Sequence, residues 1–189
     1  QQRIRLKFRF PYPTGEFSDK GTNYTTHKKH TTTVENKPGN EFLFSRSLDS
    51  DRYFVSAKLS NKSSIAKIED HYYSITPSTS TSFEATVTFS ENEPKQPFQN
   101  FTTVRANSGN MWKDFWLSGG AVDFSECTDE RAFELERRVV LSQYLTRSQC
   151  AGNYPVQETG LTYNSWFGKP HMEMYWWHTA HYPLWGRTG

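Results

Sequence analysis

The sequence predicts an α+β fold in which an antiparallel β-sandwich comes first and helices follow. Two residue patterns and the boundary between them predict it. Apolar and polar residues alternate in short segments up to about residue 95, whereas apolar residues recur at helical spacing only in the second half. A polar linker that contains two prolines, residues 91–97, lies between the two patterns. Alternation is typical of half-buried strands, and short strands without intervening helices favour a sandwich.

The first strand is expected over residues 3–10, where four basic residues alternate with four apolar ones. One face of such a strand is apolar, and the other is charged and solvated. Pro11 and Pro13 end it. Turn residues then separate further segments with strand character. These strands are expected at residues 25–35, 41–48, 53–59, 65–75 and 82–89.

The second half predicts three helices. A short helix is expected over residues 111–117, where a pair of glycines ends it. A longer helix is expected to begin after a cap at Thr128 or Asp129 and to end near residue 147. A third helix is expected over residues 169–185, with a proline that breaks or kinks it near its end.

The longer helix carries two further expectations. Glu134 and Arg138 are four residues apart, which favours an ion pair on the exposed side. Cys127 and Cys150 flank the helix, whose ends lie about 30 Å apart. Because a disulfide requires Cα atoms within about 7 Å, these two cysteines are not expected to pair with each other.

Composition argues against several function classes. The 22 basic and 20 acidic side chains leave a formal net charge of +2, which does not predict a nucleic-acid partner. The mean hydropathy of −0.81 and the lack of a long apolar run predict no membrane span. The sequence contains no glycine-rich phosphate loop and no familiar zinc signature, so neither a cofactor nor a metal is expected.

Asn23, Asn61 and Asn100 each begin an N-x-Ser/Thr sequon in polar, turn-like surroundings. Glycosylation at these asparagines predicts a secreted, extracellular protein whose leader has been removed, since the first residues contain no apolar leader segment. The alternative is that the sequons arise by chance in a chain rich in Ser, Thr and Asn.

Glu158 and Glu173 are the candidate catalytic residues. Glu158 follows a proline-containing loop and precedes a glycine, which places it at the end of an element. Glu173 lies within the third helix among aromatic and histidine residues. An apolar setting desolvates a carboxyl group, raises its pKa and suits it to donate a proton. The alternative is that either glutamate is a structural partner of a neighbouring His or Arg.

The residues around these carboxylates have the types that a saccharide site uses. Glycoside hydrolysis requires two carboxyl groups and flat apolar surfaces against the sugar. The candidate substrate contacts are Tyr163, Trp166, His171, Trp176, Trp177 and His178. Two alternatives stay open: the tryptophans belong to the core, or His171, His178 and His181 approach a metal from one helical face. For the histidines we favour the polar lining of a cleft.

Four long runs resemble the six-hairpin glycosidase-like proteins. They are FWLSGGAVDFS from Phe115, ELERRVVLSQYLTRSQCAG from Glu134, PVQETGLTYNSWFGKPHMEMYWWHTAHYPLWGR from Pro155, and upstream HTTTVENKPGNEFLFSRSLDSDRYFVSAKLS from His30. The likeness spans most of the chain and is strongest from Phe115 on. Members of this family are exported bacterial and fungal proteins with a β-sandwich ahead of an α/α toroid. The resemblance of this chain to that family implies a carbohydrate-active enzyme with acidic residues at the mouth of the toroid.

The resemblance divides the chain into a sandwich at 1–95, a bridging segment at 96–127 and the start of a toroid at 128–189. A twelve-helix toroid requires on the order of 250 residues, whereas the last segment has 62. We therefore expect the remainder of the same polypeptide to complete it, either because this chain is a fragment of a longer one or because another segment supplies the rest after nicking. The expected function is part of an exported glycoside hydrolase that acts on an oligo- or polysaccharide. The alternatives are a non-catalytic carbohydrate-binding or structural module, and a polysaccharide lyase in which Tyr and His transfer the protons.

Overall fold

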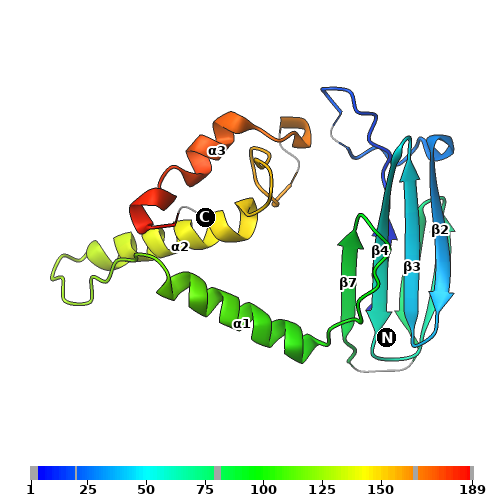
Figure 1. Ribbon diagram of the computed structural model, residues 1–189, viewed down its shortest axis with the longest axis horizontal. Coiled ribbons are helices and arrows are strands. Elements are labelled where there is room, and N and C mark those ends of the chain that lie inside the picture. Colours follow the sequence, from blue (N-terminus) through cyan, green and yellow to red (C-terminus); the bar gives the residue numbers. More distant parts are fainter. Residues whose placement is uncertain (1–3, 20, 79–81, 164–165, 188–189) are drawn as a thin grey trace. The chain divides into compact units, whose positions relative to one another are not determined.

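The computed structural model describes residues 4–19, 21–78, 82–163 and 166–187. The fold is α+β, as predicted, and the described residues form two antiparallel sheets and three α-helices (Figure 1). The chain forms two compact units. The sandwich unit comprises residues 1–14 and 22–107, and the helical unit comprises residues 15–21 and 108–189.

The sandwich unit consists of a four-stranded and a three-stranded antiparallel sheet. The larger sheet has the order β2-β3-β4-β7, with β2 at His30–Lys37, β3 at Glu41–Leu48, β4 at Asp51–Leu59 and β7 at Ala85–Ser90. The smaller sheet has the order β1-β6-β5, with β1 at Leu6–Arg9, β5 at Ser63–Glu69 and β6 at Tyr72–Pro77. A short 3-10 helix, His27–Lys29, precedes β2.

Alternation located most of these strands. The strand expected over residues 41–48 is confirmed, and β1 keeps its charged face exposed, although Arg3 of the expected strand lies outside the described residues. The single strand expected over residues 65–75 is wrong, because the chain reverses there into a hairpin of β5 and β6. His71 adopts a left-handed φ of 59° in this turn. The sequence has no Gly, Asn or Pro there that would predict the turn.

The inner faces of the two sheets form the core. Phe44 of β3 is completely buried, and its ring meets those of Phe8, Phe10 and Tyr73 at centroid distances of 5.1, 5.5 and 5.3 Å. The residues of the buried cluster are Phe10, Phe42, Phe44, Val55, Ala57, Leu59, Tyr73 and Ile75. Aromatic contacts of this kind add to the free energy gained by burying apolar area.

The inner face of β7 stays open to solvent. Phe89 pairs with the fully buried Val55, yet Phe89 is 67% exposed, and Val87 beside the buried Ala57 is 37% exposed. The three-stranded sheet therefore covers the inner faces of β3 and β4 and leaves that of β7 uncovered. The predicted alternation of β7 is right, but the burial of its apolar face is incomplete.

The helices of the chain are α1 at Phe101–Leu117, α2 at Ala132–Cys150 and α3 at Met172–Thr179, with 3-10 turns at Trp166–Gly168 and Tyr182–Trp185. The short helix expected at 111–117 is the end of α1, which begins ten residues earlier. The side chain of Asn100 caps it, since its Oδ1 accepts a hydrogen bond from the Thr103 amide at 2.8 Å. The third helix is shorter than expected, because its continuation after Thr179 is a separate 3-10 turn that contains Pro183.

For the longer helix, the predicted cap at its start is wrong, whereas the predicted ion pair is confirmed. Asp129 does not cap α2: its carboxylate accepts from the amide of Arg131 and pairs with the Arg131 guanidinium, so the helix begins at Ala132. The ion pair of Glu134 with Arg138 is confirmed, at 2.7 Å. Hydrogen bonds from Arg137 and Arg138 lower the pKa of Glu134 to about 2.

Both cysteines are free, as predicted. No described helix is long and apolar enough to cross a membrane.

A buried polar network fastens the end of the chain to α2. Gln143 is completely buried; its Oε1 accepts from Arg187 Nε at 2.8 Å, and its backbone carbonyl accepts from the Tyr182 hydroxyl at 2.7 Å. The amide of Gly120 donates to the Trp185 carbonyl at 2.7 Å. Gly119 is required beside this network, because a Cβ there would lie 2.8 Å from the same carbonyl oxygen.

Replacement of Phe44 tests the sandwich core. Phe44→Ala removes a fully buried ring and is expected to lower the free energy of unfolding by about 3–5 kcal/mol, measured by urea unfolding and far-UV circular dichroism. The control Phe89→Ala acts on a largely exposed ring and is expected to cost about 0.5 kcal/mol or less. Equal losses for the two variants would contradict this assignment of the core.

Replacement of Gln143 tests the polar network. Gln143→Ala leaves the Arg187 guanidinium without its side-chain acceptor and is expected to destabilise the helical unit by about 1–3 kcal/mol. All six tryptophans belong to that unit, so their fluorescence during urea unfolding measures the loss. The neighbouring exposed Ser142→Ala is the control, with an expected change of about 0.5 kcal/mol or less. An unchanged midpoint for Gln143→Ala would show that the network adds nothing.

Candidate functional site

Helix α3 starts where two distant segments meet. His171, the residue before the helix, is extended, with φ −142° and ψ 107°, and its amide donates to the Val156 carbonyl at 3.0 Å. Pro170 precedes it and fits this position, since a helix disfavours proline in its interior but not before its first turn. The hydrogen bond brings the segment that carries Glu158 against the start of the helix that carries Glu173.

Glu173 lies in the first turn of α3 between an indole and an imidazole. Its Oε1 accepts a hydrogen bond from Trp177 Nε1 at 3.3 Å, and its Oε2 lies 3.6 Å from His171 Nε2. The contact with Trp177 follows from the spacing of four residues, which places the two side chains on one helical face. These two polar partners orient the carboxylate.

The expected desolvation of Glu173 is wrong for the described chain, because its side chain is 67% exposed. The apolar neighbours that the sequence places around it are themselves exposed: Trp176 is 68% and Trp177 is 67% accessible. Helix α3 contacts α2, and its outer face has no described cover. Aromatic neighbours along the sequence therefore do not remove water from a carboxylate unless a second layer covers them.

Glu158 lies in a turn between α2 and α3 and is half-buried, so it is off any helical face, as predicted, but in the turn itself and not at the end of a helix or strand. Gly160 closes the turn with a φ of 61°, and its amide donates to the Gln157 carbonyl at 3.0 Å. A Cβ at Gly160 would lie 2.8 Å from the Gln149 carbonyl oxygen, so only glycine fits against the last turn of α2. The turn that holds Glu158 is thereby fixed to α2.

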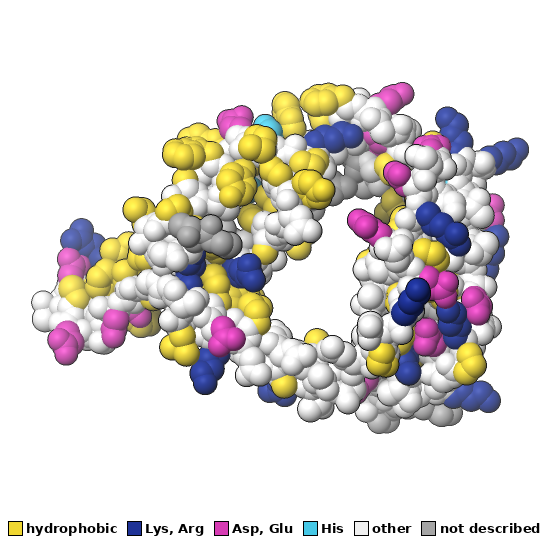
Figure 2. Space-filling view, in the orientation of Figure 1, with side chains coloured by type: hydrophobic (Ala, Val, Ile, Leu, Met, Phe, Trp, Pro, Cys, Tyr) yellow, Lys and Arg dark blue, Asp and Glu magenta, His cyan; other side chains and the backbone are white. Residues whose placement is uncertain are grey.

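The nominated aromatic residues lie on the surface. Tyr163, Trp166, Trp176 and Trp177 are all more than half exposed, and hydrophobic side chains gather over α3 (Figure 2). The alternative that these tryptophans belong to a core is wrong for the described chain. Trp166 stacks on His171, with ring centroids 6.4 Å apart and planes 11° apart. His171 is thus the one nominated residue that contacts both a tryptophan and Glu173.

A pocket of about 500 Å³ lies between the end of α2, α3 and the turn after it. Its lining includes Trp176, which the sequence nominated, and several residues that it did not nominate. Those are Thr146, Arg147, Cys150, Ala151, Gly152, Tyr175, Thr179, Ala180, Tyr182, Pro183 and Arg187. Thr146 and Cys150 are four residues apart on α2, a spacing that indicates one face. The sequence does not indicate that α3 packs against that face.

The three histidines of this region contact different groups. His178 Nδ1 lies 3.6 Å from the Sγ of Cys150, whereas the ring of His181 contacts the Thr146 hydroxyl and accepts from the Trp185 indole at 3.1 Å. Burial raises the pKa of the Cys150 thiol, so the thiol is protonated at neutral pH. Among the described residues, no three His, Cys, Asp or Glu side chains are grouped to hold a metal.

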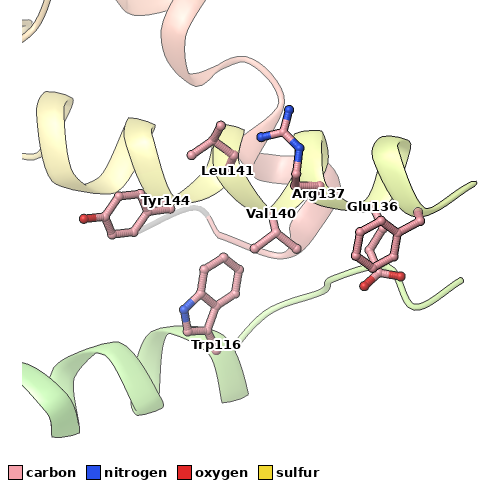
Figure 3. Close-up of a pocket in the computed structure, with 7 residues that line it drawn as sticks. Trp116, Glu136, Arg137, Val140, Leu141 and Tyr144 are labelled. Atoms are coloured by element: carbon pink, nitrogen blue, oxygen red, sulfur yellow. The ribbon is translucent and has the colours of Figure 1, made fainter. Parts of the chain in front are cut away.

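A second pocket, of about 420 Å³, lies along α2 and is mostly apolar. Figure 3 shows Trp116, at the end of α1, facing Val140 and Tyr144 of α2. Phe133, in the first turn of α2, also lines it and is 78% exposed. Neither Glu158 nor Glu173 lines this pocket or the one beside α3.

The three sequons differ in how their amide nitrogens are used. The Nδ2 of Asn23 donates to Thr26 Oγ1 at 2.6 Å, and that of Asn61 donates to the Ser82 carbonyl at 3.1 Å. Asn100 is exposed and caps α1 through its oxygen, not its nitrogen. A glycan on Asn100 would therefore keep the helix cap.

Comparison of the chain with models of known protein families, with curated proteins and with solved structures finds no match. The geometry of the site is therefore the basis for assigning a function.

Proposed function

We propose that the helical unit provides the proton donor and part of the sugar-contact surface of an exported glycoside hydrolase. The observation that carries this proposal is the setting of Glu173, whose carboxylate lies between Trp177 and His171 on a helix with exposed aromatic side chains. Flat indole faces stack on the apolar faces of sugar rings. A carboxyl group beside them is placed to protonate a glycosidic oxygen.

A general acid at neutral pH requires a carboxyl group that is shielded from water. We propose that further helices of the same polypeptide cover α3 and α2 and provide that shielding, as they would in an α/α toroid. The uncovered apolar side chains support this: Leu135, Leu141 and Tyr144 of α2 are 52%, 39% and 43% exposed, and Tyr175 of α3 is 54% exposed. Exposed large apolar side chains on helices that contact each other support a further contact with another element or molecule.

Glu158 is the proposed second carboxyl group. The hydrogen bond between His171 and Val156 holds its segment against the start of α3, and hydrolysis requires two carboxyl groups on either side of the scissile bond. In this proposal Glu173 donates the proton, and Glu158 acts as the base that activates the attacking water.

A non-catalytic carbohydrate-binding module is the second candidate. The exposure of the Glu173 side chain favours it, since a binding surface for a chain of sugars requires exposed aromatic rings but no shielded acid.

Substitution of Glu173 distinguishes the two functions. In the full-length protein, assayed against a panel of oligosaccharides, Glu173→Gln removes the transferable proton and is expected to lower kcat about 100- to 10,000-fold with little change in KM. Glu126→Gln, at an exposed position outside the site, is the matched control and is expected to keep full activity. Full activity in both Glu173→Gln and Glu158→Gln would refute the catalytic assignments. Oligosaccharide binding without turnover, lost in Trp177→Ala, would identify a binding module.

The proposed export of the protein leads to a separate prediction about glycosylation. When the chain is produced in a glycosylating secretory host, Asn100 is expected to carry the most glycan, because it is exposed and its oxygen alone serves the helix cap. Mass spectrometry of tryptic peptides measures occupancy at each sequon. Asn100→Gln serves as the control and should remove the corresponding mass shift. An unmodified Asn100 in secreted protein would contradict the prediction.

A further inference from the structure

Arg46 is a completely buried cation of the sandwich unit, on the inner face of β3. Its Nη1 donates to the Thr31 carbonyl at 3.0 Å and to Thr32 Oγ1 at 2.6 Å. Its Nη2 donates to the Pro11 carbonyl at 3.1 Å and to His30 Nδ1 at 2.7 Å. These contacts satisfy the guanidinium with neutral acceptors, and none of them is a carboxylate. A buried cation of this kind depends on its dipolar partners remaining neutral.

The hydrogen bond from Arg46 fixes the protonation of His30, and the partners of His71 fit a neutral ring. His30 Nδ1 accepts from Arg46, so it carries a lone pair and the ring is neutral. His71 Nε2 donates to the His27 carbonyl at 3.0 Å, and His71 Nδ1 accepts from the Thr32 hydroxyl at 2.7 Å. The Thr32 hydroxyl in turn accepts from Arg46. Hydrogen bonds are therefore donated from Arg46 to Thr32, from Thr32 to His71 and from His71 to the His27 carbonyl. We call His30, Thr32, Arg46 and His71 the Arg46 cluster; β2 and β3, which carry three of its residues, are neighbours in the sheet (Figure 1).

Protonation of either imidazole would put a second cation against Arg46. The rings of His30 and His71 are stacked with centroids 3.7 Å apart, and the ring of His27 stacks on that of His71 at 5.8 Å. Burial, His71 and Arg46, with a smaller effect of His27, lower the pKa of His30 to about 4. Burial also lowers the pKa of His71, against an opposing hydrogen bond to the His27 carbonyl.

The other charged and titratable groups around the cluster do not neutralise it. Asp70, in the turn between β5 and β6, favours protonation of His71, but Lys67 binds its carboxylate at 2.5 Å. Asp49 accepts from the Tyr12 hydroxyl at 3.1 Å. Lys29 adds a positive charge 5.9 Å from the Tyr12 ring. The remaining phenol groups that face the cluster are those of Tyr53, beside Arg46, and Tyr73.

The cluster holds two chain segments to the sandwich. The first, Phe10–Tyr12, contacts it through the Pro11 carbonyl, through the Phe10 ring 4.9 Å from the Arg46 guanidinium, and through the Tyr12 ring 5.5 Å from that of His30. The second, His27–His30, contacts it through the His27 carbonyl and through His30 itself. The amide of Phe10 also donates to the His71 carbonyl at 3.0 Å.

We propose that the Arg46 cluster is an acid-sensitive latch, which fastens the segments Phe10–Tyr12 and His27–His30 to the sandwich at neutral pH and releases them when its imidazoles take up protons. Protonation of His30 puts an N–H against the Arg46 guanidinium, where a lone pair accepts in the neutral ring, and protonation of His71 adds a further positive charge beside His30. The released segments lose their hydrogen bonds to the guanidinium and to the His71 ring.

The direction of the pH dependence follows from the depressed pKa. A histidine whose pKa is lower in the folded than in the unfolded state stabilises the fold above its ordinary value of 6.5. That stabilisation is lost progressively as the pH falls from about 6.5 towards the folded value of about 4. The difference means that the folded latch binds a proton on His30 roughly 300-fold more weakly than the open chain does.

Two measurements on the same chain test the latch. In NMR titration of the six histidine rings, His30 is expected to titrate near pH 4. Amide hydrogen exchange of Phe10 and Tyr12, corrected for its intrinsic pH dependence, is expected to lose about 20-fold protection between about pH 7 and 5 through His30 alone. A His30 ring that titrates near pH 6.5 would overturn the proposal. This measurement uses the wild-type chain and does not depend on whether any variant folds.

The matched variants remove the proton-binding sites. In His30→Asn combined with His71→Asn, the amide oxygens take the place of the Nδ1 acceptors, and Asn also tolerates the left-handed backbone at position 71. This double variant is expected to keep its protection at pH 5. His181→Asn, in the helical unit, is the control and is expected to lose protection as the wild type does. An unchanged loss in the double variant would refute the latch.

Discussion

Helix α3 packs against α2 on one side, and the properties of the candidate site depend on that one-sided contact. Because the other side has no described cover, Trp176, Trp177 and the carboxylate of Glu173 remain in water. The polar partners of Glu173 are local, one turn along the helix or just before it. The helix therefore fixes the direction of the carboxylate, but it does not set the dielectric environment that would tune its acidity.

The sandwich unit differs from the helical unit in that it buries a charged side chain completely. Arg46 is held by carbonyl, hydroxyl and imidazole acceptors, and the stacked rings of His30 and His71 close the site. Such an arrangement is stable only while the imidazoles are neutral. In the proposed latch, stability at this end of the sandwich is therefore coupled to pH, and Phe10, which contacts both Arg46 and Phe44, links this end to the apolar cluster.

Sequence patterns predicted the elements with strong local signals. Turn residues at 37–40 and 49–51 located β3, although its apolar and polar residues do not alternate strictly: Leu43 is buried on the face opposite Phe42, and Arg46 is buried on the inner face. Alternation failed at β5 and β6, where Asp70 is the one common turn residue in the reversal and His71 takes a left-handed conformation that Gly or Asn more often adopts. The first ten residues of α1 were missed for a related reason: the segment contains β-branched residues and Gly109, which have low helix propensity, and its start depends on the Asn100 cap.

The site was predictable where spacing along a helix decides it, and not where distant segments meet. The contact between Glu173 and Trp177 follows from a separation of four residues. The hydrogen bond that brings the Glu158 segment to α3, and the packing of Cys150 and Tyr182 around one pocket, join residues that no periodicity connects. The buried setting expected for Glu173 failed because aromatic neighbours were taken as evidence of burial.

The exposed aromatic face of α3 bears on the choice between catalysis and binding. In a binding module the tryptophans would remain in water until a sugar stacks on them, and Glu173 would not need to transfer a proton. In a hydrolase the same face requires a covering layer, because a proton donor at neutral pH must be desolvated. The uncovered side chains of α2, Phe133 and Leu135 among them, are not part of the α3 surface, and sugar stacking on α3 would leave them exposed. A layer of further helices accounts for both faces at once, which is why the hydrolase is the better-supported proposal.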